Sequence, residues 1–247
     1  MISPHCATPA ISFQNLSKCY AQQQVLRELT FDIVEGELFG LIGANGAGKT
    51  TCIKGLLDFC EISSGAIEIF GVPHLETHAR ERVAYLPERF LPPYYLTGRD
   101  FLKYMARLHD ATFDATRVDD MLTRLDLDAS ALDKSVRQYS KGMAQKLGLA
   151  ACFLSAKDLF ILDEPTSGLD PKAHILVKRH LQALRSQGAS ILISTHMLTD
   201  AEQLCDRMGV LHEGRLQFIG TPAQCCEAYG VDHLEDAYLR LIEEHAR

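Results

Sequence analysis

The 247-residue chain has 25 Lys and Arg against 32 Asp and Glu, a formal net charge of -7. An acidic chain without a Lys/Arg run argues against binding to the nucleic-acid backbone, so no nucleic-acid partner is expected. Hydrophobic residues make up 47% of the chain and charged residues 23%, a balance that excludes intrinsic disorder and allows a sizeable core.

The first third of the chain predicts mainly strands. Residues 11–13 and 25–34 have strand patterns separated by polar residues. Residues 38–42 are apolar throughout, which indicates a strand buried on both faces. A glycine-rich loop and a helical pattern from residue 48 to 59 follow. This order predicts a β-loop-α unit.

The middle of the chain changes from strand to helix. Strand patterns at 66–70 and 83–86 come first. From 97 to 154 apolar residues recur at helical spacing, which predicts an all-helical insertion.

The last third alternates again. Strand patterns at 159–162 and 190–194 enclose a predicted helix over 171–185. Asp170 suits the N-cap of that helix and Pro171 its first position. The remaining predicted elements are a hairpin of 208–211 and 215–219, a short helix from 221, and a helix over 234–244.

The glycine-rich loop matches the pattern G-x-x-x-x-G-K-[ST] in full, between a strand and a helix. Glycines let successive backbone N–H groups turn toward a phosphate, and the following helix adds its positive end. The lysine supplies a point charge and the threonine a hydroxyl ligand for Mg²⁺. The residues expected to contact nucleotide here are Gly43, Asn45, Gly46, Ala47, Gly48, Lys49, Thr50 and Thr51.

A second apolar strand, 158–162, ends in two carboxylates. In a P-loop fold we expect it beside the strand at 38–42. Asp163 is then placed to hold Mg²⁺ and Glu164 to polarise the attacking water. The alternative is a pair of solvated acids at a strand end.

These motifs, together with the run 163–170 (Asp-Glu-Pro-Thr-Ser-Gly-Leu-Asp), His196 and the segment 139–146, resemble an ABC-transporter nucleotide-binding subunit. The resemblance covers nearly the whole chain, in the family's motif order. It implies an α/β fold: a P-loop NTPase core with a flanking antiparallel β-subdomain and an inserted all-helical subdomain. The expected division is 1–87 and 157–220 for the core with its β-subdomain, 88–156 for the helical subdomain and 221–247 for a C-terminal helical tail.

The resemblance also implies residue roles. Tyr20 matches the aromatic that stacks on adenine, although plain packing is the alternative. Ser140 and Gly142 match signature residues that contact the γ-phosphate held by the opposite subunit. Asp170 matches an aspartate at the dimer interface, and His196 a histidine that senses the γ-phosphate. Two cassettes are expected to face head to tail, so that each site needs both chains.

Physical chemistry supports part of this assignment. Ser140 suits the N-cap of a helix over 141–153, whose N-terminus would face an incoming phosphate. Lys141 would add positive charge there. An ordinary helix cap is the alternative for Ser140.

Two positions depart from the family pattern. The signature Leu-Ser-Gly-Gly-Gln is here Tyr139-Ser140-Lys141-Gly142-Met143, and Glu88 stands where a glutamine usually contacts Mg²⁺ and the lytic water. Such variants, with a terminal helix like 234–241, resemble the branch that exports polysaccharides, drugs or sodium. That branch works with a separate membrane subunit, so export is favoured over import.

An apolar and aromatic run follows Glu88 in what should be a surface loop: Phe90, Leu91, Pro92, Pro93, Tyr94, Tyr95 and Leu96. Such a cluster suits a partner interface, here the membrane subunit. The alternative is that these side chains pack under the helical subdomain.

No signal peptide is expected, because the N-terminus lacks a charged segment followed by an apolar one. The apolar runs are shorter than the ~20 residues that span a bilayer. Eight scattered cysteines without a Cys-x-x-Cys pair favour reduced cytosolic thiols.

The sequence therefore predicts an ATPase that uses ATP and Mg²⁺, pairs with a second ATP-binding subunit and works at the cytoplasmic face of the membrane through a separate permease. One rival is a soluble ABC-type ATPase acting on ribosomes or nucleic acid. Such proteins typically carry two cassettes or a long coiled-coil insertion, and this chain has neither. A P-loop kinase is the other rival, but it leaves the 139–146 segment and His196 unexplained.

Overall fold

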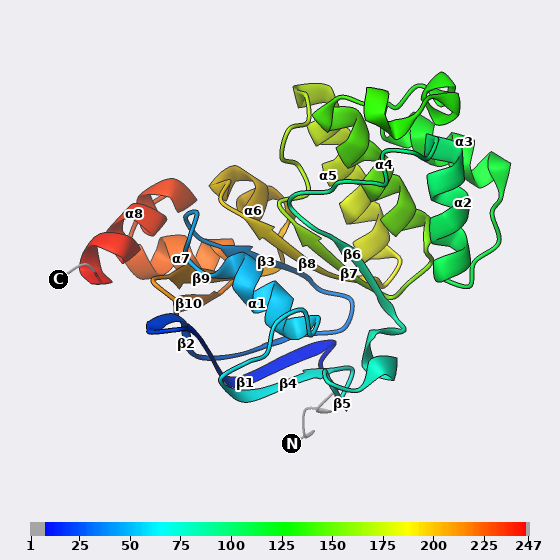
Figure 1. The fold of residues 1–247 in the computed structure, drawn as a ribbon. Helices are drawn as coiled ribbons and strands as arrows, with labels where there is room; N and C mark the ends of the chain where they lie inside the picture. The colour runs from blue at the N-terminus through cyan, green and yellow to red at the C-terminus, as the bar shows by residue number, and fades with distance from the viewer. Residues whose placement is uncertain (1–7, 246–247) are drawn as a thin grey trace, which may run out of the picture.

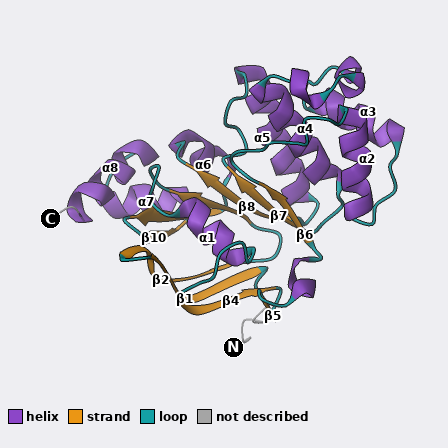
Figure 2. Cartoon of the chain, in the orientation of Figure 1, coloured by secondary structure: helices purple, strands orange, loops and turns teal. Residues whose placement is uncertain are grey.

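The computed structural model describes residues 8–245. The predicted absence of a signal peptide concerns a segment that lies largely outside this range, as does Cys6. Figure 1 shows two sheets with the helices of residues 98–186 gathered at one end of the molecule, and Figure 2 separates helices from strands by colour. The last helices lie at the opposite end, beside the described C-terminus.

The larger sheet of the described chain has six strands in the order β10-β9-β3-β8-β7-β6. It is parallel except for β10, which pairs with β9 as a hairpin. Its strands are β3 Leu38–Ile42, β6 Val83–Leu86, β7 Leu159–Asp163, β8 Ser190–Thr195, β9 Arg207–His212 and β10 Arg215–Gly220. The central strands are buried throughout, as their apolar sequences predict.

The smaller sheet is antiparallel and has the order β2-β1-β4-β5 in the described chain. Its strands are β1 Ile11–Tyr20, β2 Gln23–Ile33, β4 Ser64–Ile69 and β5 Val72–Pro73. β1 continues well beyond the predicted 11–13, because register shifts between Phe13 and Leu16 let the strand pass Asn15, which has a φ of 50°. A polar residue therefore interrupts the sequence pattern without ending the strand.

The helices are α1 Lys49–Leu56, α2 Gly98–Leu108, α3 Ala115–Arg124, α4 Lys141–Leu154, α5 Pro171–Ser186, α6 Leu198–Leu204, α7 Pro222–Tyr229 and α8 Leu234–His245. Short 3-10 turns lie at Thr77–Arg80, Ala129–Asp133 and Val136–Gln138. The predicted helical insertion thus holds α2, α3 and α4. Asp170 caps α5 by accepting from the Ala173 N–H at 3.0 Å, with Pro171 at the first position, as predicted.

Two apolar clusters form the core, one on each face of the parallel sheet. Leu38 and Ile42 of β3 belong to the cluster that includes α2–α6, whereas Phe39 and Leu41 belong to the cluster shared with α1 and the antiparallel sheet. This alternation along one strand joins both layers to the strand that precedes the glycine-rich loop.

One predicted adjacency is wrong. The strand that ends in the two carboxylates, β7, does not lie beside β3, because β8 is inserted between them. The error has a physical cause: strand order in a sheet depends on crossover connections, which the apolar pattern of a strand does not encode.

Part of the apolar run after Glu88 is packed under the helical subdomain and part of it is exposed at the surface. Phe90 packs against Phe101 of α2, with ring centroids 5.6 Å apart, and Leu96 is also partly buried against the core. Leu91, Tyr94 and Tyr95 remain 73%, 69% and 72% exposed. The run is therefore anchored under the helices at its ends and exposed in between.

None of the helices within residues 8–245 combines the length and the apolar character needed to cross a bilayer. Every cysteine in the same range is a free thiol.

Candidate functional site

The carboxyl ends of β3 and β7 border a cavity of about 550 Å³. Parallel strands direct the loops that follow them to one edge of the sheet, where ligand sites of open α/β folds form. The lining residues come from distant parts of the chain: Tyr20, Val25, Ala44, Asn45, Gly46, Gly48, Lys49, Thr50, Thr51, Glu88 and Glu164. A volume of this size suits a small organic ligand.

The loop between β3 and α1 depends on its glycines. Gly48 has a φ of 114°, and a Cβ there would lie 2.7 Å from Leu26 Cδ2. A Cβ on Gly43 would lie 2.4 Å from the Leu211 carbonyl oxygen. No side chain of the described residues caps α1 at Gly48. The N-terminal N–H groups of α1 are thus available to an anion, as a phosphate-binding loop requires.

The Lys49 ammonium group lies at the buried end of this loop. It donates to the carbonyl oxygens of Gly43 at 2.6 Å and Ala44 at 3.3 Å, and lies 3.6 Å from Glu164 Oε1. The Lys49 side chain is only 6% exposed. A nearly buried cation paired with a carboxylate and backbone oxygens is well placed to exchange these partners for phosphate oxygens.

Asp163 joins the loop to the second acidic strand. Its Oδ2 accepts a hydrogen bond from Thr50 Oγ1 at 2.8 Å, and its Oδ1 accepts one from the Ser194 hydroxyl. The insertion of β8 therefore does not separate Thr50 from Asp163. Burial and the nearby Asp163 charge raise the pKa of Tyr85 to about 12, so this phenol stays neutral.

Ser194 was not among the predicted site residues. Its Oγ donates to Asp163 and accepts from the Glu164 backbone N–H at 3.1 Å, so one hydroxyl bonds the Asp163 carboxylate and the backbone of Glu164. The available signal was weak, because Ser194 is one of three hydroxyl residues in the strand Ser190–Thr195. That signal becomes informative only once β8 is known to adjoin β7.

The backbone of Glu164 lies in the left-handed region, which is strained for a residue with a side chain. Its φ is 49°, which is uncommon for a residue other than glycine. Both carboxylate oxygens lie 3.0 Å from His196 Nδ1, and the side chain is 7% exposed. Strain of this kind persists only where surrounding contacts fix the backbone, and it is concentrated at functional sites. Lys49, Glu164 and His196 thus form one contiguous group in the structure.

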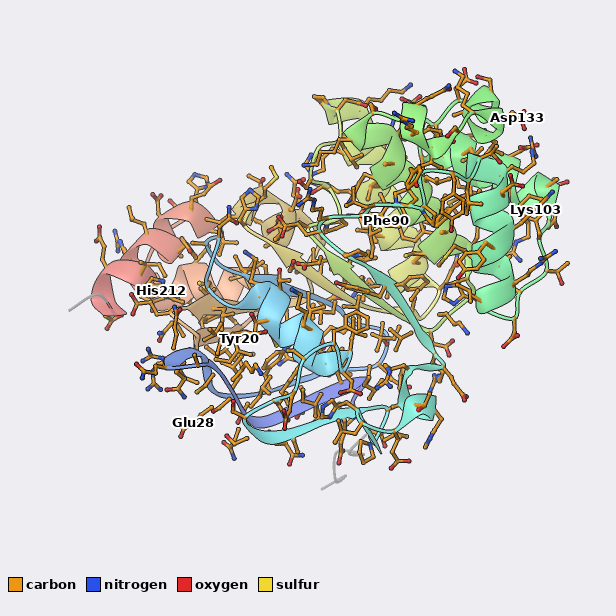
Figure 3. The ribbon with its side chains drawn as sticks, in the orientation of Figure 1. Tyr20, Glu28, Phe90, Lys103, Asp133 and His212 are labelled. Atoms are coloured by element: carbon orange, nitrogen blue, oxygen red, sulfur yellow. The ribbon has the colours of Figure 1, made fainter. Side chains whose placement is uncertain are left out.

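Tyr20 ends β1 at the mouth of the cavity and is 45% exposed. Its hydroxyl interacts with Cys60 and Thr51, and the hydrogen bond with the Cys60 thiol, followed by desolvation, raises the pKa of Tyr20. Figure 3 labels Tyr20 beside α1 and Phe90 near the helices of the insertion. An exposed ring at a cavity mouth favours a ligand-stacking position over plain packing.

Ser140 and Lys141, two predicted residues of the signature segment, lie outside the nucleotide cavity. Ser140 caps α4 by accepting from the Met143 N–H at 3.2 Å, and Lys141 Nζ donates to Ser167 Oγ at 3.3 Å. Both residues line a second hollow of about 500 Å³, next to the loop after Glu88. Of the predicted residues, Glu88 alone lines both hollows in the described chain, and its side chain is exposed.

Gly142 and Asp170 lie near the segment that follows Glu164. A Cβ on Gly142 would lie 3.1 Å from the Gly168 carbonyl oxygen. Asp170 Oδ2 lies 3.6 Å from Lys146 Nζ of α4. The predicted site residues therefore divide into a phosphate-loop group and a signature group, and neither Ser140 nor Gly142 borders the first cavity.

Comparison with known proteins identifies the family. Residues 26–167 match the family described as ABC transporter. The chain is 37% identical to the uncharacterized ABC transporter ATP-binding protein YdbJ of Bacillus subtilis, over 85% of this chain and 69% of that protein. It is 40% identical to the Nod factor export ATP-binding protein I of Burkholderia pseudomallei, over 91% of this chain and 75% of that protein.

Solved structures agree. A structure described as the ATP binding subunit of an ABC transporter superposes with a TM-score of 0.86 at 33% identity, covering 94% of this chain and 99% of that one. A dimeric ATP-binding cassette bound to ADP and Pi superposes with a TM-score of 0.78 at 19% identity, over 85% of this chain and 98% of that one. The second likeness concerns the fold.

The sequence motifs, the geometry of the cavity and the similar proteins all indicate the same family. The P-loop NTPase core, the antiparallel sheet and the inserted helices are the predicted architecture. The chain belongs to the ABC transporter family, as one of its ATP-binding and ATP-hydrolysing subunits.

Proposed function

We propose that this chain is the motor subunit of an exporter and that two such subunits close over two ATP molecules. The observation that carries the proposal is the separation of the two groups of site residues. Ser140 and Lys141 line a different hollow from Lys49 and Glu164. A phosphate bound in the first cavity would reach a signature segment only if a second subunit supplied it.

Within one chain, the phosphate loop binds the nucleotide. Gly43, Asn45, Gly46, Ala47 and Gly48 form the loop whose free backbone N–H groups cradle the phosphates, together with the Lys49 ammonium and the first turn of α1 through Thr51. The exposed Tyr20 ring receives the adenine. The uncapped N-terminus of α1 supports this arrangement.

The oxygen atoms around Thr50 fit Mg²⁺. Thr50 Oγ1 and Asp163 Oδ2 are 2.8 Å apart, and Glu88 borders the same cavity. Mg²⁺ prefers oxygen ligands and is commonly bound by one or two carboxylates together with substrate phosphates. Bound there, the ion would neutralise phosphate charge. Thr50, Asp163 and Glu88 are therefore the residues we assign to hold it.

Glu164 is the residue we assign to orient the attacking water, with His196 beside it and Glu88 at the same cavity. The contact of Glu164 with Lys49 and His196 supports this assignment, because a carboxylate next to the phosphate-binding lysine is within reach of water at the γ-phosphate. In the closed pair, Ser140, Lys141 and Gly142 meet the γ-phosphate held by the other subunit. Asp170 lies at the interface, where its acidic side chain is exposed.

The names of the relatives support export, which we propose runs through a separate permease. The Nod factor export ATP-binding protein I of Burkholderia pseudomallei shares 40% identity with the chain. The departures at Lys141, Met143 and Glu88 resemble the same branch. We place the subunit at the cytoplasmic face of the membrane, held there by the permease. We divide the chain into a core, a helical subdomain over 88–156 and a tail from 221. In this arrangement the helical subdomain faces the permease.

The docking surface for the permease is the hollow beside Glu88. The exposed Leu91, Tyr94 and Tyr95 follow Glu88 directly, and Phe90 anchors their loop against α2. Exposed aromatic side chains at the edge of a hollow are typical of interface anchors. Because Glu88 borders both hollows, a docked partner would also contact the loop that reaches the nucleotide.

The test is the oligomeric state of Glu164→Gln with ATP and Mg²⁺. We expect this variant to lose turnover by about 100-fold or more and to sediment as a dimer, while the wild type returns to monomer as ATP is consumed. Glu202→Gln, an exposed change on α6, is the matched control and should behave as the wild type. A Glu164→Gln chain that remains monomeric, alone and with its permease, would contradict the proposal.

A further inference from the structure

We propose that Asp200 of α6 is a positioning residue for hydrolysis, acting through Thr166 on the segment 164–170 that begins with Glu164. This inference rests on the proposed role of Glu164 in orienting water. Asp200 does not line the nucleotide cavity. Its effect would come from holding a neighbouring segment in place.

Asp200 is a buried carboxylate that accepts from three side chains. Its exposed fraction is 2%. His174 Nε2 lies 2.9 and 3.0 Å from its two oxygens, Lys178 Nζ donates to Oδ1 at 3.0 Å, and Thr166 Oγ1 donates to Oδ2 at 3.2 Å. A buried carboxylate is tolerated only with such donors, so its position is tightly fixed.

The three donors come from the segment 164–170 and from the helix that follows it. Thr166 is the third residue of that segment, and His174 and Lys178 lie on α5, the helix that follows it. Asp200 itself lies on α6, four residues after His196. One carboxylate thus connects the strand end that carries Glu164, the next helix, and the helix that follows His196.

The bond between Thr166 and Asp200 is a second link between the two parts of the chain that the contact between Glu164 and His196 also joins. The Glu164 and His196 side chains meet at 3.0 Å, with Glu164 lining the cavity, while Thr166 and Asp200 meet at 3.2 Å and line no part of it. Glu164 holds a left-handed backbone with a φ of 49°, which the surroundings must enforce. The bond from the Thr166 hydroxyl, two residues later, is suited to this task.

Another carboxylate near α6 shows what a purely structural pair looks like. Asp206 accepts from Arg185 of α5 at 2.8 Å and from the Leu38 N–H of β3 at 3.0 Å. It joins α5 to the sheet as Asp200 joins α5 to α6. Within the described chain its bonds go to Leu38 and Arg185 and not to segment 164–170, so Asp206→Asn is a matched control.

The experiment compares Thr166→Val, Thr166→Ser, Asp200→Asn and Asp206→Asn in steady-state ATPase assays, with ATP affinity and thermal unfolding measured on the same proteins. Thr166→Val removes the hydroxyl but leaves the pairs between α5 and α6. We expect Thr166→Val and Asp200→Asn to lower kcat about tenfold while KM and ATP affinity stay within about twofold. Thr166→Ser should retain the wild-type kcat, and Asp206→Asn should retain it even where its unfolding temperature falls.

A wild-type kcat for Thr166→Val would overturn the inference. So would a loss of kcat in Asp206→Asn equal to that in Asp200→Asn, because the effect would then follow stability alone. Glu164→Gln, assayed in parallel, separates the two proposals. If it still turns over, the role of Glu164 fails; if it is inactive while Thr166→Val is normal, only the role of Asp200 fails.

Discussion

The nucleotide cavity and the hollow beside the helical insertion differ in how completely the chain organises them. In the cavity, Lys49, Thr50 and Glu164 are held by partners within the same chain, at 2.6–3.6 Å. Beside the insertion, Leu91, Tyr94 and Tyr95 have most of their surface exposed. The side chains of the first region already have partners within the chain, whereas the second presents surface that another molecule could cover.

The largest expected effect tests whether the signature group acts on another subunit. Lys49→Ala and Gly142→Asp should each lower ATPase activity by about 100-fold or more, the first by removing a phosphate contact and the second by adding a carboxylate near one. Mixed together, the two inactive chains should regain activity, because a mixed pair has one site with neither change. Mixtures that stay inactive, although each chain folds and pairs, would contradict assembly of the site from two subunits.

The next effect concerns the exposed tyrosines. Tyr94→Ser combined with Tyr95→Ser should leave ATPase activity of the isolated subunit within about twofold, because neither side chain lines the nucleotide cavity. Transport by the assembled complex should be lost. The measurement is transport in vesicles carrying the permease, with Tyr104→Ser on the outer face of α2 as the control. Normal transport by the double variant would exclude this loop as the docking surface.

A smaller effect is expected at the cavity mouth. Tyr20→Ala should weaken ATP binding about tenfold, since stacking of a base on an aromatic ring contributes about 1–3 kcal/mol. Tyr20→Phe keeps the ring and should bind ATP as the wild type does. Equilibrium binding measured by calorimetry distinguishes them. Equal weakening in both variants would show that the hydroxyl, with its Cys60 and Thr51 contacts, matters and the ring does not.

The smallest effect is expected at Glu88, which borders both the nucleotide cavity and the hollow beside the helical insertion. Glu88→Gln keeps nearly the same shape and should change kcat by less than about tenfold, with an altered dependence on Mg²⁺ concentration. ATPase rates over a range of Mg²⁺ concentrations provide the measurement. A complete loss of activity would show that the charge at Glu88 is itself required.

The sequence determined a large part of this protein. The glycine spacing at 43–48, the lysine and threonine that follow, and the acids that end β7 are local patterns, and local patterns fix a loop, a helix start or a strand end. The hairpin of β9 and β10 and the capped start of α5 were predictable for the same reason.

The tertiary structure determined which residues distant in the sequence are in contact. The insertion of β8 between β3 and β7, the bridging hydroxyl of Ser194, and the burial of Asp200 against Thr166 join residues about 30 or more positions apart. It likewise split the apolar run after Glu88 into the anchored Phe90 and the exposed Tyr94 and Tyr95. Such contacts depend on strand order and helix packing, which are set by the whole core and not by any single segment.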